Sequence, residues 1–202
     1  MENYIVMNGQ RVELTEKQVA RIRESFREKN VKLATVAAGE TCMIGSHEMI
    51  VLEHIDGNTL LLRKDALEKM RFGENNNYDG SAVDRVCNEF AGEVAEIVGE
   101  DNIVLHEVDM TADDGLKDYG KVSRKASLRT ANMQRKYVEV LDKYRLDDWE
   151  WLATAYTTPT HDEDNWVKCV SPAGSFNNYD SNYFNFAVRP FCILKSDIFV
   201  SN

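Results

Sequence analysis

A hairpin and one amphipathic helix are predicted for the first thirty residues. Two short β-prone runs within residues 4–14 flank Asn8-Gly9, a pair that suits the positive φ angles of a tight turn. Thr15 and Gln18 have the spacing of a capping box. Apolar residues then recur at helical spacing among charged ones: Val19, Ile22 and Phe26. We therefore expect a hairpin followed by a helix over residues 15–29, and we treat residues 1–30 as an N-terminal extension.

A buried hairpin and a long helix are predicted for the centre of the chain. Two nearly continuous apolar runs, 49–55 and 59–63, flank the turn sequence Asp56-Gly57-Asn58, which indicates strands buried on both faces. Beyond the N-cap residue Ser81, apolar residues keep helical spacing until Gly99, which can end the helix. These apolar residues are Val83, Val86, Cys87, Phe90, Val94, Ile97 and Val98.

The remaining pattern predicts a second helix and then a strand-rich end. An amphipathic helix begins after Thr130, with one apolar face made by Met133, Tyr137, Val140, Leu141 and Tyr144. Helical spacing disappears after Trp149, and β-prone runs occupy 149–154, 166–170, 184–188 and 191–194. All three prolines and 12 of the 19 aromatic residues lie from Tyr144 onward. We expect an α+β domain over residues 31–202, with helices packed on a mixed, loop-rich sheet.

Composition and charge exclude several classes of protein. A chain of 202 residues with 43% hydrophobic residues can build one ordinary core. The net charge of −10 argues against a nucleic-acid partner, because neutralising phosphates requires Lys and Arg. No run approaches the roughly 20 apolar residues that span a bilayer, so we expect no membrane insertion. The first residues lack signal-peptide features, which indicates synthesis in the cytoplasm.

One segment departs from this acidic balance. Residues 117–145 contain nine Lys and Arg against three Asp and Glu, so this segment carries +6 and the remainder carries −16. We expect these basic side chains to pair with acidic ones elsewhere in the chain or to form a solvated helix face.

Candidate catalytic and metal-binding residues are few. The four scattered cysteines, Cys42, Cys87, Cys169 and Cys192, are expected to be reduced thiols. Cys169 and Cys192 both lie in the aromatic C-terminal part, where strand pairing could join them in a thiol or copper site. Four aspartates surround Gly115 and could supply oxygen ligands for calcium, but their spacing lacks the EF-hand pattern; they are Asp109, Asp113, Asp114 and Asp118. We expect no catalytic residue, metal or cofactor.

The segment 174–186 has the composition of a recognition surface. It holds five aromatic residues and four Asn, with no Lys, Arg or Glu. Tyr and Phe supply contact area at low entropic cost, while Ser and Asn supply adaptable hydrogen bonds. The alternative is a set of strands whose alternate aromatic side chains enter the core. The predicted ligand-binding residues are Asp162, Asp164, Asn165, Trp166, Ser175, Phe176, Asn177, Asn178, Tyr179, Asp180, Asn182, Tyr183, Phe184 and Asn185. Tyr179 and Tyr183 are expected to be anchors whose loss leaves the fold intact.

Three elements near the C-terminus resemble a known signature. They are Trp149-Glu150-Trp151-Leu152, the run 167–174, and Ala187-Val188-Arg189-Pro190. Together they resemble the Trp-Trp-Leu and Gly-Val-Arg-Pro elements of a family of uncharacterised bacterial and phage proteins, over roughly residues 40–202. The chain departs from that family where Ala187 replaces Gly and where Ala153-Thr154 replaces Arg-Ser.

That family is similar to the C-type-lectin-like fold shared by formylglycine-generating enzymes and the variable proteins of diversity-generating retroelements. The resemblance implies a rigid structural frame of Trp149, Trp151, Arg189, Pro190 and Phe191 beneath a variable face. It implies a non-enzymatic protein that displays residues 162–186 to a protein or glycan target. The crowding of Asn, Tyr, Asp and Ser also suits a reverse transcriptase that alters template adenines.

Two other functions stay open. One is an enzyme of the formylglycine-generating type, or another thiol or metal enzyme, centred on Cys169 and Cys192. The other is an acidic phage protein that inhibits a host enzyme. The N-terminal extension could pack on the domain, join protomers into a homo-oligomer, or attach the domain to a phage particle, which would make the protein virion-associated.

Overall fold

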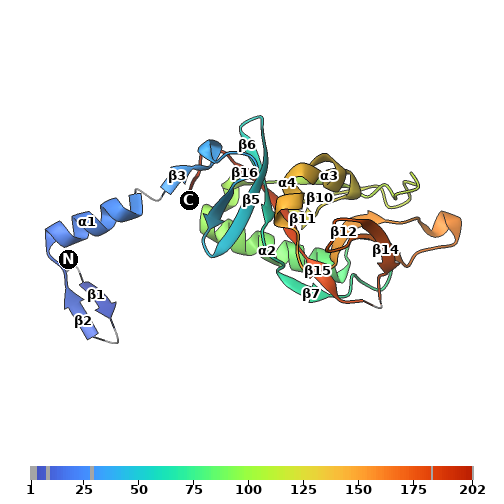
Figure 1. Cartoon of the computed structure of the whole chain (residues 1–202), viewed down its shortest axis with the longest axis horizontal. Coiled ribbons are helices and arrows are strands. Elements are labelled where there is room, and N and C mark those ends of the chain that lie inside the picture. The colour runs from blue at the N-terminus through green and yellow to red at the C-terminus, as the bar shows by residue number, and fades with distance from the viewer. Residues whose placement is uncertain (1–3, 8–9, 28–29, 183, 202) are drawn as a thin grey trace.

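The computed structural model describes residues 4–7, 10–27, 30–182 and 184–201, and shows a mixed α+β protein made mostly of strands. Figure 1 shows a body of two main sheets with helices packed on them, from which the N-terminal extension leads away. Within the described ranges no helix is long and apolar enough to cross a membrane.

The extension consists of the expected hairpin and helix. Strands β1 (Tyr4–Met7) and β2 (Gln10–Glu13) pair antiparallel, and α1 (Glu16–Arg27) follows. The capping box is present, since the Thr15 amide donates to Gln18 Oε1 at 2.9 Å and the Gln18 amide donates to Thr15 Oγ1 at 3.3 Å. The predicted turn residues Asn8 and Gly9 lie outside the described residues.

The larger sheet has eight strands in the order β11-β16-β6-β5-β4-β17-β3, with β8 also paired to β16. Their bounds are β3 (Asn30–Lys32), β4 (Thr41–Ile44), β5 (His47–Ile55), β6 (Asn58–Arg63), β8 (Ile103–Val104), β11 (Ala126–Leu128), β16 (Pro190–Lys195) and β17 (Phe199–Ser201). Asp56 and Gly57 take φ angles of 49° and 76°, which confirms the tight turn between β5 and β6.

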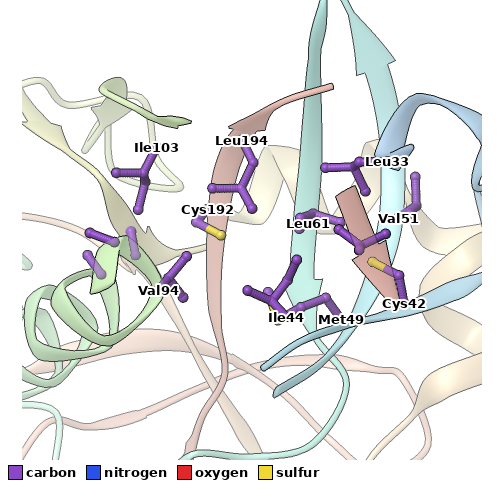
Figure 2. Close-up of a cluster of buried hydrophobic side chains, with 14 of the residues drawn as sticks. Leu33, Cys42, Ile44, Met49, Val51, Leu61, Val94, Ile103, Cys192 and Leu194 are labelled. Atoms are coloured by element: carbon purple, nitrogen blue, oxygen red, sulfur yellow. The ribbon is translucent and has the colours of Figure 1, made fainter. Parts of the chain in front are cut away.

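Helices cover both faces of this sheet. On one face α2 (Ala82–Val98) packs Phe90 and Val94 against strand residues such as Leu61, in the cluster drawn in Figure 2. On the other face Tyr137 and Leu141 pack against Ile50, Leu62 and further residues. The central hairpin is therefore buried on both faces, as its continuous apolar runs predict. Ser81 caps α2 and Gly99 follows its last residue, which confirms both predicted ends.

The helix predicted after Thr130 is broken into short pieces. They are α3 (Ala131–Lys136), α4 (Val138–Leu141) and the 3-10 turn η3 (Asp142–Tyr144). Tyr137 has φ −104° and ψ 19°, outside helical geometry. Its aromatic ring and the nearby β-branched valines are weak helix formers, which explains why a continuous helix was the wrong prediction. The five residues of the predicted apolar face still pack together in one cluster.

The smaller sheet has five strands in the order β14-β13-β12-β15-β7. Their bounds are β7 (Glu68–Met70), β12 (Glu150–Ala155), β13 (Trp166–Val170), β14 (Phe176–Asp180) and β15 (Phe186–Val188). Strands β9 (His106–Asp109) and β10 (Lys121–Arg124) form a separate hairpin. The other 3-10 turns are η1 (Leu33–Thr35), η2 (Glu100–Asn102) and η4 (Pro159–His161).

The chain passes directly from the smaller to the larger sheet at Arg189, because β15 ends at Val188 and β16 begins at Pro190. Arg189 is 1% exposed and donates from Nε to the Arg63 carbonyl at 2.7 Å. Its Nη1 and the Nη2 of Arg129 both contact the buried Glu150 carboxylate, at 3.5 and 2.8 Å. Burial lowers the pKa of Arg189 to about 10 although Glu150 opposes this effect. Two guanidinium groups that share one carboxylate thus tie the sheets together.

The basic segment 117–145 pairs with acidic residues elsewhere, as its charge predicts. Lys121, for example, contacts Glu107, and Arg124 lies 2.7 Å from the Asp84 carboxylate. The excess positive charge of this segment is therefore largely satisfied within the molecule.

Candidate binding surface

The candidate surface is built on the antiparallel pair β13 and β14, and β14 forms one edge of the smaller sheet. Alternate side chains along a strand point to opposite faces, and directly paired residues share a face. We call the face that carries Trp166, Lys168, Phe176, Asn178 and Asp180 the outer face. The opposite, inner face carries Val167, Cys169, Asn177 and Tyr179. Val167, Cys169 and Tyr179 pack in the core cluster, whereas Asn177 is exposed.

Tyr179 lies on the inner face and not at the surface where an anchor was expected. Its ring centroid lies 5.0 Å from that of Trp149, 4.9 Å from Phe184 and 5.3 Å from Phe186. The strand alternation of β14 turns Tyr179 inward, so its position is that of a packing residue, and so is that of Phe184. Tyr183, the second expected anchor, lies outside the described residues.

The structural frame lies beneath this aromatic cluster and at the junction of the sheets. Trp151 is fully buried, and its indole nitrogen donates to the Met70 carbonyl at 2.9 Å. Trp149 stacks on Phe186 at 5.6 Å. Phe191 is buried on the larger sheet among the residues covered by α3 and α4. These aromatic residues give β12 and β13 a rigid support.

A charged cluster holds the middle of the outer face in place. Lys168 is only 7% exposed, and its Nζ lies 3.1 Å from Asp113 Oδ2. Arg135 of α3 contacts Asp113 Oδ1 at 2.8 Å and lies 4.9 Å from the Phe176 ring. Partial burial opposes ionisation of Asp113, but the hydrogen bonds from Arg135 and Lys168 outweigh it and lower the pKa of the Asp113 carboxyl.

A cavity of about 530 Å³ opens beside this cluster and is lined by Asp113, Asp114, Tyr156, Thr157, His161 and Glu163. Tyr156 is 44% exposed and Trp166 is 41% exposed. The amide of Tyr156 donates to the Trp166 carbonyl at 2.8 Å, so the two exposed aromatic residues are neighbours across the ladder. The exposed rings of Tyr156 and Trp166 therefore lie next to the polar side chains that line the cavity.

Within the cavity, His161 is held by its Nδ1 atom. Nδ1 lies 3.0 Å from Asp114 Oδ2 and 3.3 Å from Thr157 Oγ1. The pKa of the Asp114 carboxyl is lowered because hydrogen bonds, led by that from Thr157, outweigh desolvation. In a Ser-His-Asp relay the carboxylate and the hydroxyl contact opposite ring nitrogens. Here both contact the same nitrogen, so this arrangement positions the imidazole but does not activate Thr157.

The two acidic segments of the sequence meet near η4. The Asp118 carboxylate accepts hydrogen bonds from Thr158 Oγ1 and Thr160 Oγ1, each at 2.6 Å. Asp114 and Asp118 are therefore engaged in holding the segment before β13. Among the described residues, no three His, Cys, Asp or Glu side chains converge in a metal-binding arrangement.

The other predicted binding residues lie in turns around the hairpin. Asn182 donates from its side chain to the Glu74 carbonyl at 2.9 Å. The carbonyl of Asn165 accepts from the Ser181 amide, and Ser175 closes the turn between β13 and β14 with Ser171. Besides Trp166, the exposed predicted side chains are that of Asn177 on β14 and those of Asp162, Asp164, Ser175, Asn182 and Asn185 outside the strands. The predicted set is thus divided among the outer face, the inner face and turns.

The structure separates the two C-terminal cysteines, whose pairing the sequence left open, and both are buried free thiols. Cys169 packs beneath β13 and Cys192 packs on β16, in different core clusters. The reason is the switch between sheets at Arg189-Pro190. Burial raises the pKa of both thiols to about 12, the opposite of what a reactive thiolate requires.

Sequence reasoning missed much of the cavity. Tyr156, Thr157, His161 and Lys168 are not among the binding residues predicted from the sequence. One signal was present, since Lys168 is the sole charged residue in the apolar run 166–170. A buried Lys in a strand requires a partner, and Asp113 provides it from a distant loop.

No family model, curated protein or solved structure matches the chain.

Proposed function

We propose that this chain is a non-enzymatic binding protein of C-type-lectin-like fold that holds an uncharged glycan at the outer face of β13 and β14. The observation that supports this most directly is the pair of exposed rings, Tyr156 and Trp166, next to a cavity lined by polar side chains. The Trp and Val-Arg-Pro elements support the lectin-like part of the proposal, because their side chains build the scaffold below this surface.

The chemistry of the lining suits hydroxyl-rich ligands. A sugar ring has apolar C–H faces that pack on aromatic rings, and Tyr156 and Trp166 offer such rings. Its hydroxyl groups can donate to the carboxylates of Asp114 and Glu163. The hydrogen bonds that hold His161, Asp114 and Lys168 keep these groups ordered before a ligand arrives, which reduces the entropic cost of binding.

The local charge favours an uncharged ligand over an anionic one. Besides the paired Asp113, the carboxylates of Asp114 and Glu163 line the cavity. Asp162 and Asp164 adjoin lining residues in the chain, and Asp118 accepts a hydrogen bond from Thr158, the residue after Thr157. Two basic side chains that contact the lining residue Asp113, those of Lys168 and Arg135, are already paired with it. Sulfated or sialylated glycans would therefore meet a repulsive field.

The first prediction tests this surface. The protein is applied to an array of neutral and anionic glycans, and the affinity of the strongest ligand is measured for wild type, Tyr156→Ala and Trp166→Ala. We expect each substitution to weaken binding at least tenfold, or about 1.4 kcal/mol. Leu105→Ala is the matched control, because Leu105 is 62% exposed and lies on another part of the molecule.

Unchanged affinity in both aromatic variants would show that the surface is misassigned. A preference for anionic glycans would contradict the charge argument. If only a protein target binds, and Trp166→Ala abolishes that binding, the binding surface is correctly assigned but its ligand is a protein and not a glycan.

The proposed diversification by a retroelement predicts which positions of the chain vary and which stay constant. Codons that vary among copies of the gene should encode side chains that can change without disturbing the core, such as Trp166, Asn177 and Asn185. Tyr179 and Phe186 should stay constant, because their rings pack together at 5.3 Å. Sequencing the 3′ end of the gene in a source population, with a search for an adenine-bearing template copy, tests this proposal.

A further inference from the structure

Two buried arginines share one carboxylate at the junction of the two sheets. Arg129 follows β11, Glu150 begins β12, and Arg189 joins β15 to β16. Each of the three residues is at most 4% exposed. Arg129 Nη2 lies 2.8 Å from Glu150 Oε2, and Arg189 Nη1 lies 3.5 Å from the same oxygen. The cluster therefore holds two positive charges and one negative charge away from water.

Each of the two guanidinium groups has one nitrogen atom without an acceptor. Arg129 donates from Nε to Gln134 Oε1 at 2.6 Å. Arg189 donates from Nε to the Arg63 carbonyl at 2.7 Å. The atoms that are left, Nη1 of Arg129 and Nη2 of Arg189, are buried and have no hydrogen-bond partner among the described residues. Each carries two N–H groups, and buried donors that stay unpaired are costly.

The charge of this cluster is not balanced by its neighbours. In the part of the chain that the structure describes, Glu150 is the only carboxylate paired with either arginine. Burial lowers the pKa of Arg189; Glu150 opposes this effect, and the nearby charge of Arg129 reinforces it. Asp65 also acts on Arg189, but it is exposed, so water screens its charge. A buried positive charge without a counter-charge is strongly destabilising, so the cluster is one negative charge short.

The backbone holds both arginines in place. The Ala153 amide donates to the Arg129 carbonyl at 3.0 Å. On either side of Arg189, Val188 pairs with β7 and Pro190 pairs with β11. The unpaired nitrogen atoms are therefore fixed donors, as a preorganised binding site requires.

We propose that the unpaired nitrogen atoms of Arg129 and Arg189 hold a small monovalent anion such as chloride, buried where the two sheets meet. One negative charge makes the cluster neutral. A water molecule would accept hydrogen bonds but leave the charge uncompensated, and a divalent anion such as phosphate would reverse the imbalance.

This anion is a structural one. Because the two nitrogen atoms are closed to solvent, the anion binds as the protein folds and is released when it unfolds. It therefore stabilises the native state by mass action. The site is independent of the glycan proposal, since neither arginine lies on the outer face or lines the cavity beside it.

The first test measures the melting temperature as chloride replaces gluconate at constant ionic strength. Above the dissociation constant, a tenfold rise in chloride should raise the melting temperature of the wild type by about 3–5 °C. Gln134→Glu places the missing charge next to Arg129 in a side chain of nearly the same shape. The melting temperature of this variant should not depend on chloride.

Asn132→Asp is the matched control. It makes the same change from amide to carboxylate on the same helix, α3, but Asn132 is exposed. Its melting temperature should respond to chloride as that of the wild type does. Because general effects of the salt act on both variants alike, a difference between them reports the buried site. Circular dichroism checks that each variant is folded.

Bromide locates the site in the wild type without any substitution. In crystals grown in bromide, we expect an anomalous scattering peak between Arg129 Nη1 and Arg189 Nη2. A wild type that does not respond to chloride, a Gln134→Glu variant that responds as the wild type does, or an Asn132→Asp variant that loses the response would overturn the proposal. So would ordered water at both nitrogen atoms with no bromide peak.

Discussion

At the scale of single residues, burial decides what chemically similar side chains do. Trp151 and Trp166 belong to neighbouring strands of the same sheet, yet Trp151 is fully buried and Trp166 is 41% exposed. The first packs on Phe72 and Phe186 and donates to a backbone carbonyl, whereas the second offers its ring to solvent. The same contrast separates Tyr179, which packs inward, from Tyr156, which lines the cavity.

This contrast gives a matched pair of stability predictions. We expect Trp151→Ala to lower the free energy of unfolding by about 3–5 kcal/mol, because it removes a large buried ring and leaves a cavity. Trp166→Ala should cost less than about 1.5 kcal/mol, because much of its ring already contacts water. Chemical denaturation of both variants checks this prediction. Equal losses would mean that the two tryptophans are not placed as described.

His106 gives a prediction about pH. Burial lowers the pKa of His106 to about 4, and its ring contacts Ser127 and Phe191. The unfolded chain, with an ordinary histidine pKa of about 6.5, binds the proton more readily, so stability falls as the pH decreases from about 6.5 to about 4. This difference amounts to about 3 kcal/mol at pH 4.

The matched variant is His106→Gln, which removes the titrating group but keeps a polar side chain. The unfolding free energy of the wild type minus that of the variant should fall by about 3 kcal/mol from pH 7 to pH 4, because only the wild type carries the histidine. A difference that does not change with pH would show that His106 is accessible to protons in the folded protein.

At the scale of elements, the spacing of apolar residues predicted where α2 lies and which of its side chains are buried. It did not predict whether the helix after Thr130 is continuous. Helix α2 begins and ends where Ser81 and Gly99 indicate, because caps and apolar spacing agree. The helix after Thr130 breaks at Tyr137, although its apolar face packs as expected. Strand β14 lies in the Asn-rich segment that was expected to be a recognition surface; pairing with β13 makes it a strand with one face inward.

The outer face itself could be predicted only in part. Trp166, Phe176, Asn178 and Asp180 were selected from composition and share one face of the hairpin. The cavity was not predicted, because Asp113 and Asp114 come from a loop some fifty residues earlier, and Lys168 gains its role from that distant partner. Side-chain spacing carries no information on such long-range contacts.

At the scale of the whole molecule, the body and the extension make separate contributions. The four core clusters of buried residues lie between Leu33 and Val200, within the body. Removal of residues 1–29 should therefore leave a folded body. At low protein concentration, we expect its melting temperature to stay within about 2 °C of that of the full chain, since few core contacts are lost.

Calorimetry of the truncated and full-length chains checks this prediction. Loss of cooperative unfolding in the truncated chain would show that the extension is part of the domain.

By itself, the sequence determined the α+β class, the ends of the best-capped helix, the buried central hairpin and the N-terminal hairpin and helix. These features depend on contacts between residues close in the chain, which the spacing of apolar and capping residues records. Only the tertiary structure decided that Tyr179 packs inward, that Cys169 and Cys192 lie in different sheets, and that Asp113 and Lys168 meet at a cavity. Each of these outcomes depends on strand register and on the passage between sheets at Arg189-Pro190, and those are properties of distant segments once packed together.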